Sequence, residues 1–505
     1  MKNTYALLSY IVIFTCFLSR HLPAREIIIT TVNELQNAIG DLASHDTILI
    51  ANGTYCITAT LTINNKQEKI SDVLIKGQSG NRDSVMLWCP GMGVQSSSAP
   101  HVFNIYNIEN LTIADLTAGK TYWHPVTISG QSGAESISLK NLHLVDAGEQ
   151  FIKVNNREDP KCDNGIVDGC LLEYTDYAFW AGDHYYTQGF DKIGGGDNWI
   201  VRNCIIKNIR PHPEHVDHAD GCGAAITYWQ GGTNNIVEKN LLVNCRMGIQ
   251  FGISDNTGVS GGIIRNNIIY RGADEVGGDN GIMINDSPDC KVYNNTVILN
   301  ATFDPSGDGK GKAMEYRWDG SINLQMKNNL CDGLIWERTA GLSPEIAGNI
   351  LDAPLSFFKD PSAIDLHLKA TADEAVDKGI SLPEVIDDID GDKRPVNNHY
   401  DIGADEYTEI VAIKNNLPEE WVRCTPIHCS YDRHSIFSLY LSRKNRITVA
   451  LYTPTGKKVL EHSRLSGPGS HTLAVNTITV SCGIYYCIVS TNTGYRTSYT
   501  IILTR

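Results

Sequence analysis

The sequence predicts an all-β protein: a right-handed parallel β-helix, which is a solenoid of short strands, followed by a small antiparallel β-sandwich. Three observations predict it: a recurring phrase, a marker asparagine in most copies, and a change of pattern after residue 410. The phrase is a short apolar strand, an asparagine and a second apolar strand. Such a unit cannot bury its apolar face alone, so stacked copies close the core.

The phrase can be followed along most of the first 330 residues. Clear copies lie at 200–206, 236–242, 262–269 and 291–298, and a fainter copy lies at 324–330. The marker positions are 110, 141, 169, 203, 240, 267, 295 and 329, which are spaced 31, 28, 34, 37, 27, 28 and 34 residues apart. We expect the marker asparagines to stack at a turn, where Asn tolerates the left-handed conformation and its amide bonds to neighbours above and below. That role is structural.

Length and charge set limits on the class of protein. The chain has 505 residues, a formal net charge of −15 and a pI near 5.4. A single compact core is not expected at this length, whereas the core of a solenoid is a column. The acidic balance argues against a general nucleic-acid binder, so no nucleic-acid partner is expected. An acidic polysaccharide stays compatible, because a local basic cleft can lie in an acidic molecule.

The N-terminus, residues 1–24, is predicted to be a secretory signal peptide. Lys2 precedes an apolar run at 6–18 that is too short to span a bilayer comfortably. An uncleaved anchor is the alternative. The sequence has no other segment of about 20 apolar residues, so we expect no transmembrane segment in the mature chain.

The β-helix is predicted over residues 25–410. Helical spacing at 32–39 predicts a short amphipathic cap helix for the open N-terminal end, since an exposed strand end invites edge pairing. After Leu330 the phrase fades into a tail, which we expect to act as a cap. Cys170, Cys204 and Cys245 lie in or beside copies of the phrase and are expected to be small buried residues.

The C-terminal region changes character after a polar linker at 411–425. Alternating strands at 446–460, 481–489 and 495–503 predict an antiparallel sandwich over 426–505. Its pattern L-Y-x-x-x-G-K-K-V, its G-I-Y-Y and its final basic strand resemble the C-terminal sorting domain of the type IX secretion system of Bacteroidota. This resemblance implies that the secretion machinery is a partner, and that the protein is secreted or attached to the outer-membrane surface. An appended carbohydrate-binding sandwich is the alternative.

Residues 26–406 as a whole resemble the pectate-lyase-like superfamily of β-helix proteins, which includes polysaccharide lyases and pectin-type hydrolases. The resemblance concerns the fold far more than the activity. Pectin-type hydrolases need paired aspartates followed by Gly-His-Gly, whereas the one adjacent pair here, Asp387-Asp388, lies in the tail and no Gly-His-Gly exists. Hydrolysis by that mechanism is therefore disfavoured.

The long intervals between marker positions predict loops that can carry function. The first insertion, 174–196, continues to Asp197 and contains candidate calcium ligands and candidate contacts with a uronate. The calcium candidates are Asp183, Asp191 and Asp197, and the others are Lys192 and Tyr185. A solvated turn with aromatic packing is the alternative.

The other two insertions are 210–222 and 302–320. The first holds His212, His215 and His218 among three carboxylates, but this spacing fits neither a helix face nor a strand face. A polar loop near the cleft is therefore favoured over a transition-metal site, although a histidine there could transfer protons near neutral pH.

Residues on the strands supply a further set of candidates, because rungs hold side chains at fixed heights. The catalytic candidates are Lys153, Lys192, Arg246 and Arg317, and the candidates for stacking on a sugar are Tyr228, Trp229 and Trp318. A cation can neutralise a uronate carboxylate and acidify its C5 proton, and a base then takes that proton. Solvated surface residues are the alternative for each.

The sequence thus predicts a monomeric, exported β-helix protein that acts on an acidic polysaccharide by lyase-type β-elimination, with calcium as the candidate cofactor. The calcium-binding β-helix lyases carry an asparagine and a glutamate pair beside a lysine and an arginine, and that set cannot be placed in this sequence. A non-catalytic glycan-binding or adhesive protein and a glycoside hydrolase therefore stay open as alternatives.

Overall fold

The structure is a computed structural model of the chain, and it separates into two compact units, Met1–Tyr407 and Thr408–Arg505. The described residues of the first unit are 24–64, 68–95, 97–175, 187–210, 223–273, 278–300, 311–339 and 341–407. Those of the second are 408, 425–427, 434–441, 444–453, 457–467, 469–476, 480, 483–492 and 496–503. Nearly all of the predicted signal peptide lies outside them.

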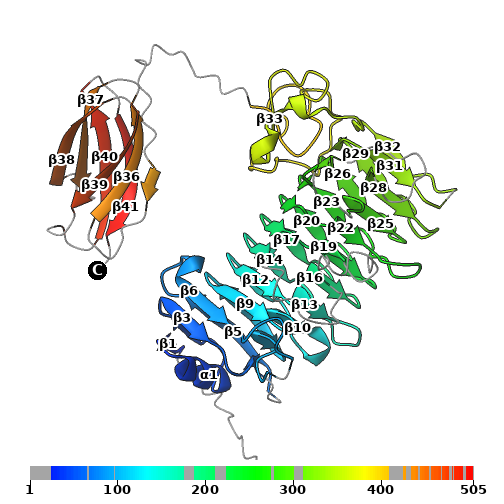
Figure 1. Cartoon of the computed structure of the whole chain (residues 1–505), viewed down its shortest axis with the longest axis horizontal. Coiled ribbons are helices and arrows are strands. Elements are labelled where there is room, and N and C mark those ends of the chain that lie inside the picture. The colour runs from blue at the N-terminus through cyan, green and yellow to red at the C-terminus, as the bar shows by residue number, and fades with distance from the viewer. Residues whose placement is uncertain are drawn as a thin grey trace, which may run out of the picture. The chain divides into compact units, whose positions relative to one another are not determined.

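The first unit is the predicted right-handed parallel β-helix, built from three long parallel sheets (Figure 1). Sheet A consists of β1 (Glu26–Ile29), β2 (Thr47–Ile50), β5 (Ile70–Gly77), β8 (Ile108–Ala114), β11 (Ser138–Lys140), β14 (Ile166–Asp168), β17 (Ile200–Arg202), β20 (Ile236–Glu238), β23 (Ile263–Arg265), β26 (Lys291–Tyr293), β29 (Gln325–Lys327) and β32 (Glu345–Ala347). Sheet B consists of β3 (Gly53–Cys56), β6 (Val85–Trp88), β9 (Thr117–Thr121), β12 (His143–Ala147), β15 (Leu171–Glu173), β18 (Ile205–Lys207), β21 (Leu241–Val243), β24 (Ile268–Tyr270), β27 (Thr296–Ile298) and β30 (Leu330–Cys331). Sheet C consists of β4 (Leu61–Ile63), β7 (Phe103–Ile105), β10 (Val126–Ser129), β13 (Gln150–Asn155), β16 (Gln188–Ile193), β19 (Ala224–Trp229), β22 (Met247–Phe251), β25 (Ile282–Asn285), β28 (Lys312–Arg317) and β31 (Leu334–Glu337).

The N-terminal end of the column carries the predicted cap helix as α1 (Val32–Gly40) (Figure 1). Thr31 begins it with a capping box: its hydroxyl accepts from the Glu34 amide at 3.2 Å, and the Glu34 carboxylate accepts from the Thr31 amide at 3.0 Å. Leu35, Ala38 and Ile39 are buried, so the apolar face of the helix closes the core.

The marker asparagines occupy two adjacent positions of the turn between sheets A and B, where the sequence pattern had suggested one. The first position has a positive φ and is held by Asp115, Asn141, Gly169, Asn203, Lys239, Asn266, Asn294 and Asn328. The next position points into the core and is held by Leu116, Leu142, Cys170, Cys204, Asn240, Asn267, Asn295 and Asn329. The prediction that Asn110 holds this place was wrong, because Asn110 lies inside β8, before the turn of its rung. The prediction that one asparagine supplies both the left-handed turn and the stack was therefore wrong, because the turn needs φ > 0 while the stack needs a buried amide.

The buried amides form a continuous ladder. Asn240 Nδ2 donates to Asn267 Oδ1 at 2.9 Å, Asn267 to Asn295 at 2.9 Å, and Asn295 to Asn329 at 3.0 Å. Asn349 receives the last bond, at 2.9 Å from Asn329. In the earlier rungs Leu or Cys fills the place, and Cys170, Cys204 and Cys245 are buried as predicted.

The tail covers the side of the solenoid at its last rungs. It contains η6 (Leu355–Phe357), β33 (Phe358–Asp360), η7 (Pro361–Ala363) and β34 (Asp365–Leu368). Phe357, Phe358 and Leu366 form a core with Ile268 and Ile298 of sheet B. The tail thus shields the outer face of sheet B, which would otherwise expose apolar residues.

The second unit is a pair of small antiparallel sheets, in agreement with the predicted sandwich. One consists of β35 (Thr425–Ile427), β36 (His434–Leu441) and β39 (Gly469–Asn476), and the other of β38 (Lys458–Ser466), β37 (Asn445–Tyr452), β40 (Gly483–Thr491) and β41 (Arg496–Leu503). Its role in sorting stays a prediction. Within the described parts of both units, no helix has the length and apolar character needed to cross a membrane.

Candidate active site on the outer face of sheet C

The outer face of sheet C carries a column of side chains in register. Its inner face is apolar, with Ile152, Phe190 and Ile226 paired in the core, so the next residue of each strand points outward. The outward column consists of Asn104, Thr127, Lys153, Asp191, Thr227, Gln250, Met283, Glu315 and Trp336. This column is polar over most of its length, unlike the outer face of sheet B under the tail.

All three predicted insertions connect a strand of sheet B to the next strand of sheet C. They follow β15, β18 and β27 and precede β16, β19 and β28. Residues 176–186, 211–222 and 301–310 of these connections lie outside the described residues. The predicted site residues Asp183 and Tyr185 and the histidine-rich loop belong to them.

A pocket of about 520 Å³ lies on this face at β7, β10 and β13. Its walls combine two histidines, one carboxylate, aromatic rings, amides and hydroxyls. They are His101, Asn104, Tyr106, Trp123, His124, Thr127, Ser129, Gln131, Ser132, Glu149 and Asn155. Amides and hydroxyls beside aromatic rings suit a carbohydrate, which offers both hydroxyl groups and apolar C–H faces.

His124 and Glu149 form the chemical centre of this pocket. His124 Nδ1 lies 3.0 Å from the Gln150 carbonyl, which can only accept, so Nδ1 carries a proton. The second nitrogen, Nε2, lies 3.7 Å from Glu149 Oε2, and both side chains are largely buried. The ring of His101 stacks on that of His124 at a centroid distance of 5.3 Å. The 3.7 Å contact is longer than a hydrogen bond, and it places an imidazole and a carboxylate side by side in the pocket.

The protonation of both partners is tuned by burial. Burial raises the pKa of Glu149 to about 7, Lys153 opposes this rise, and the Asp191 carboxylate adds to it. Burial also lowers the pKa of His101. A carboxyl group with a pKa near 7 exists in both forms at neutral pH, which is the condition for a general acid or base.

Lys153 and Asp191, two of the predicted site residues, are brought together beside this pocket. They are register partners on β13 and β16, and the Lys153 ammonium bonds to Asp191 Oδ2. Asp191 Oδ1 is buried and has no partner among the described residues. The ammonium thus takes one oxygen of the Asp191 carboxylate and leaves the other without a partner among the described residues. Asp197 lies beyond β16, where its Oδ1 accepts from the Thr233 amide at 2.7 Å. Calcium binding at Asp183, Asp191 and Asp197 therefore stays a prediction that only the undescribed loop could complete.

Lys192 points the other way, into the core. It is fully buried, and its Nζ donates to the carbonyls of Gly195 at 2.5 Å and Gly196 at 2.8 Å. Burial lowers the pKa of Lys192 to about 7. Its nitrogen faces the Tyr228 ring at 5.3 Å, and Tyr228 is itself buried. Both side chains are enclosed in the core, so neither lines the outer face of sheet C, and the prediction that they contact the substrate was wrong.

Arg317 and Trp318 lie together at the other end of the same face. The Arg317 guanidinium lies 3.7 Å from the centre of the Trp318 ring. Arg246 lies just before β22 and near Asp279, and Trp229 ends β19 with its Nε1 buried and without a partner among the described residues. β13 and β28 are five strand steps apart in sheet C, which is about 24 Å at the usual strand spacing. Lys153 and Arg317 thus do not meet in one centre.

Reasoning from the sequence missed His101, His124 and Glu149. His101 and His124 lie two residues before β7 and β10, one rung of 23 residues apart, and Glu149 lies directly before β13. That periodic placement of polar residues was the available signal. It was hidden because these rungs have no long insertion.

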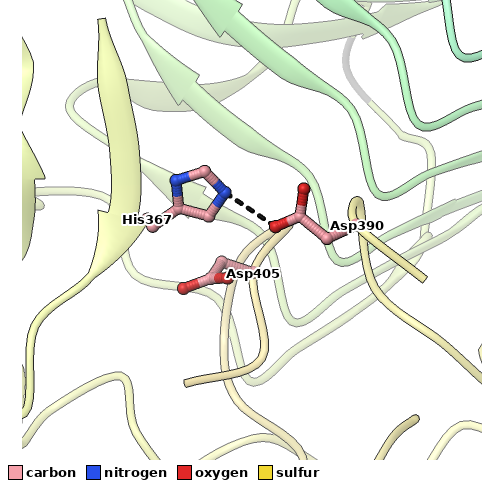
Figure 2. A group of neighbouring side chains, drawn as sticks. All are labelled: His367, Asp390 and Asp405. Atoms are coloured by element: carbon pink, nitrogen blue, oxygen red, sulfur yellow. Dashed lines mark hydrogen bonds and ion pairs between the residues drawn. The ribbon is translucent and has the colours of Figure 1, made fainter. Parts of the chain in front are cut away.

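A second cluster of titratable groups lies in the tail, away from the pocket's lining. Among the described residues, His367, Asp390 and Asp405 form one group close enough to hold a metal ion (Figure 2). His367 Nε2 already bonds to Asp390 Oδ2 at 2.7 Å, and Nδ1 bonds to Asp365 Oδ1 at 2.5 Å. The two carboxylates raise the pKa of His367 to about 9, with the bond to Asp390 as the largest cause. The imidazolium therefore takes the place of a cation and ties β34 to the turn that contains Asp390.

This tie predicts a pH-dependent attachment of the tail. The pKa of His367 is higher in the folded tail than in an unfolded chain, so its stabilising effect is complete below about pH 6.5 and is lost as the pH rises through about 9. We expect His367→Gln to lower hydrogen-exchange protection of the Leu368 amide by about 1–2 kcal/mol at pH 6, an amount already reduced for partial exposure, and to have little effect at pH 10. An equal loss of protection at both pH values would contradict this prediction.

Comparisons with known proteins give neighbours in fold only. No protein-family model and no curated protein matches the chain. Among solved structures, it is similar to an alginate lyase from Paenibacillus sp. str. FPU-7 (13% identity, TM-score 0.43, 64% of this chain and 97% of that one). It is also similar to a PL6 family polysaccharide lyase from Pseudopedobacter saltans (12%, 0.29, 76% and 100%). A third neighbour is the family 28 exopolygalacturonase of Yersinia enterocolitica (10%, 0.27, 65% and 79%). At such identities and scores, their activities carry no argument for this chain.

Proposed function

We propose that the protein is a polysaccharide lyase that cleaves an acidic polysaccharide in the pocket of sheet C. The observation that carries this proposal is the buried Glu149–His124 pair, whose carboxyl pKa lies near 7 in a pocket lined with sugar-compatible groups. β-Elimination requires a base that takes the C5 proton and an acid that gives a proton to the leaving oxygen, and the pair offers one group for each step.

The proposed reaction uses groups of this chain alone. In this reaction the Lys153 ammonium, which lies beside the pocket and is paired with Asp191, shifts part of its hydrogen bonding to the uronate carboxylate and thereby acidifies the C5 proton. The ionised Glu149 carboxylate takes that proton, a C4=C5 double bond forms, and the C4–O bond breaks. His124, as its imidazolium, returns a proton to the departing oxygen. Trp123 and Tyr106 offer ring faces to the neighbouring sugars.

Export is part of this proposal, because a polysaccharide too large to enter a cell must be cleaved outside it. The C-terminal unit has the antiparallel strands expected for a type IX sorting domain, which supports a secreted or surface-attached enzyme. The measurement is the mass of the protein in culture medium and in outer-membrane fractions. A mass reduced by that of the C-terminal unit would indicate cleavage during export, and protein in the outer-membrane fraction would indicate attachment to the surface.

The test is incubation of the full chain with polygalacturonate, polymannuronate, polyguluronate and hyaluronate. A lyase produces the ultraviolet absorbance of an unsaturated uronate together with new reducing ends. Reducing ends without that absorbance would identify a hydrolase instead. Binding without any product would identify a non-catalytic glycan-binding protein. Either result would overturn the proposal.

A further inference from the structure

We propose that a basic cluster at the far end of sheet C is a second binding subsite, which holds a carboxylate of the same polysaccharide chain. The subsite consists of Lys312, Arg317, Arg338 and Trp318. This inference rests on the proposed substrate class, an acidic polysaccharide, but not on the reaction.

The cluster has more positive than negative charge. Lys312 Nζ lies 3.3 Å from Glu315 Oε2, and Arg338 Nη1 lies 3.3 Å from Glu315 Oε1. Arg317 Nε is farther from Glu315, at 3.9 Å, and it donates to Asn285 Oδ1 at 2.9 Å. Three cations thus surround one buried carboxylate. The charge left over suits an incoming anion, and the Arg338 side chain is 53% exposed and accessible to it.

The carboxyl group of Asp279 reduces the excess of positive charge only in part. Asp279 is buried nearby, and burial raises its pKa, so the environment opposes its negative form. Asn280 donates from Nδ2 to Glu315 Oε2 at 3.2 Å. Its Oδ1 is buried and has no partner among the described residues. An unpaired buried acceptor costs free energy, and a sugar hydroxyl could pair with it.

Trp318 supplies an aromatic face beside these charges. It follows β28 directly, and it has a positive φ of 65°, an unusual backbone conformation for a bulky side chain. Gln230 and Asp286, which directly follow β19 and β25, have the same conformation, so it belongs to the turn after sheet C and sets where the ring lies. The Arg317 guanidinium lies against one face of the ring, which fixes the ring in place.

The subsite and the pocket lie on the same outer face of sheet C, and one column of paired residues runs from one to the other. Glu315 belongs to the same outward column as Lys153, five strand steps away. The span is about 24 Å, and the column between them carries Asp191, Thr227, Gln250 and Met283. An extended polysaccharide laid along the column would reach both places, whereas a trisaccharide would not.

The experiment measures binding by calorimetry with Glu149→Gln, so that the ligand is not consumed. The ligands are oligogalacturonates and oligoguluronates of three and of ten sugars. We expect Arg338→Ala and Trp318→Ala, each added to this variant, to weaken binding of the decasaccharides roughly tenfold and to leave trisaccharide binding unchanged. Arg202→Ala is the matched control, since Arg202 is a partly exposed arginine paired with Asp168 on sheet A.

The outcomes separate the two proposals. An unchanged affinity for decasaccharides, or equal losses for short and long oligomers, would overturn the subsite even if the enzyme is a lyase. A length-dependent loss in a protein that makes no unsaturated product would support the subsite and overturn the lyase. If the Arg202 control weakens binding as much as Arg338→Ala, the effect is one of general charge and the subsite is overturned.

Discussion

Glu149→Gln is expected to lower turnover by roughly 10²–10⁴-fold while the protein stays folded, because an amide cannot take or return a proton. The substitution keeps the size and shape of the side chain beside His124, so binding should change little. The measurement is the rate of unsaturated product, with the melting temperature as the check on folding. Turnover within a few fold of the unmodified enzyme would show that the base lies elsewhere.

The matched control for Glu149→Gln lies on another sheet. His143 Nε2 and Glu173 Oε1 form a similar pair, 3.0 Å apart, on the outer face of sheet B. Glu173→Gln should leave turnover unchanged. Because the pKa of Glu149 is about 7 and the base is its ionised form, kcat/KM should rise with pH through about 7. This rising limb should disappear in Glu149→Gln.

Asn267→Leu is expected to lower the free energy of unfolding by about 3–5 kcal/mol, because several buried polar groups would lose their partners. Asn267 Oδ1 accepts from the amide and the side chain of Asn240 at 3.0 and 2.9 Å. Its Nδ2 donates to the Val237 carbonyl and to Asn295 Oδ1, both at 2.9 Å. Leucine fills the volume and satisfies none of these groups.

The measurement is a denaturant titration followed by tryptophan fluorescence. Asn203→Gly is the control: Asn203 takes the left-handed position of its turn, is exposed, and is replaced by Gly169 one rung earlier. It should change stability by less than about 1 kcal/mol. A destabilisation of similar size in both variants would mean that the buried ladder contributes nothing specific.

The same two positions show how far the sequence could predict the fold. The recurring apolar strands predict the solenoid and its length, because burial demands them in every rung. The sequence could not separate the turn position from the buried position, since Asn occupies both in Asn266-Asn267 and Asn294-Asn295. The rung with Lys239 before Asn240 separates them, since Lys239 has the positive φ and Asn240 is buried, and the rung with Asn203 before Cys204 shows the reverse placement of Asn.

The candidate site was harder to predict for a geometric reason. Lys153 and Asp191 are 38 residues apart and touch, while Lys153 and Arg317 share a face but lie five strands apart. The distance between two residues along a solenoid is set by the number of rungs between them. Insertions of different length make that number hard to read from the sequence. The insertions predict Asp183 and Tyr185 as site residues, whereas Glu149 belongs to a short rung that has no insertion. Whether those loops contribute to the site stays a prediction.

The asparagine ladder begins only at Asn240, and the pocket lies on rungs that precede it. In a linear array, stability is a sum of terms for single rungs and terms for neighbouring rungs. The hydrogen bonds between buried asparagine side chains therefore add to the coupling between rungs in one half alone. The C-terminal half therefore has one coupling term more, while the backbone hydrogen bonds of the parallel sheets join the rungs of both halves. We expect the rungs with the pocket to open locally at a lower free energy than the rungs with the ladder.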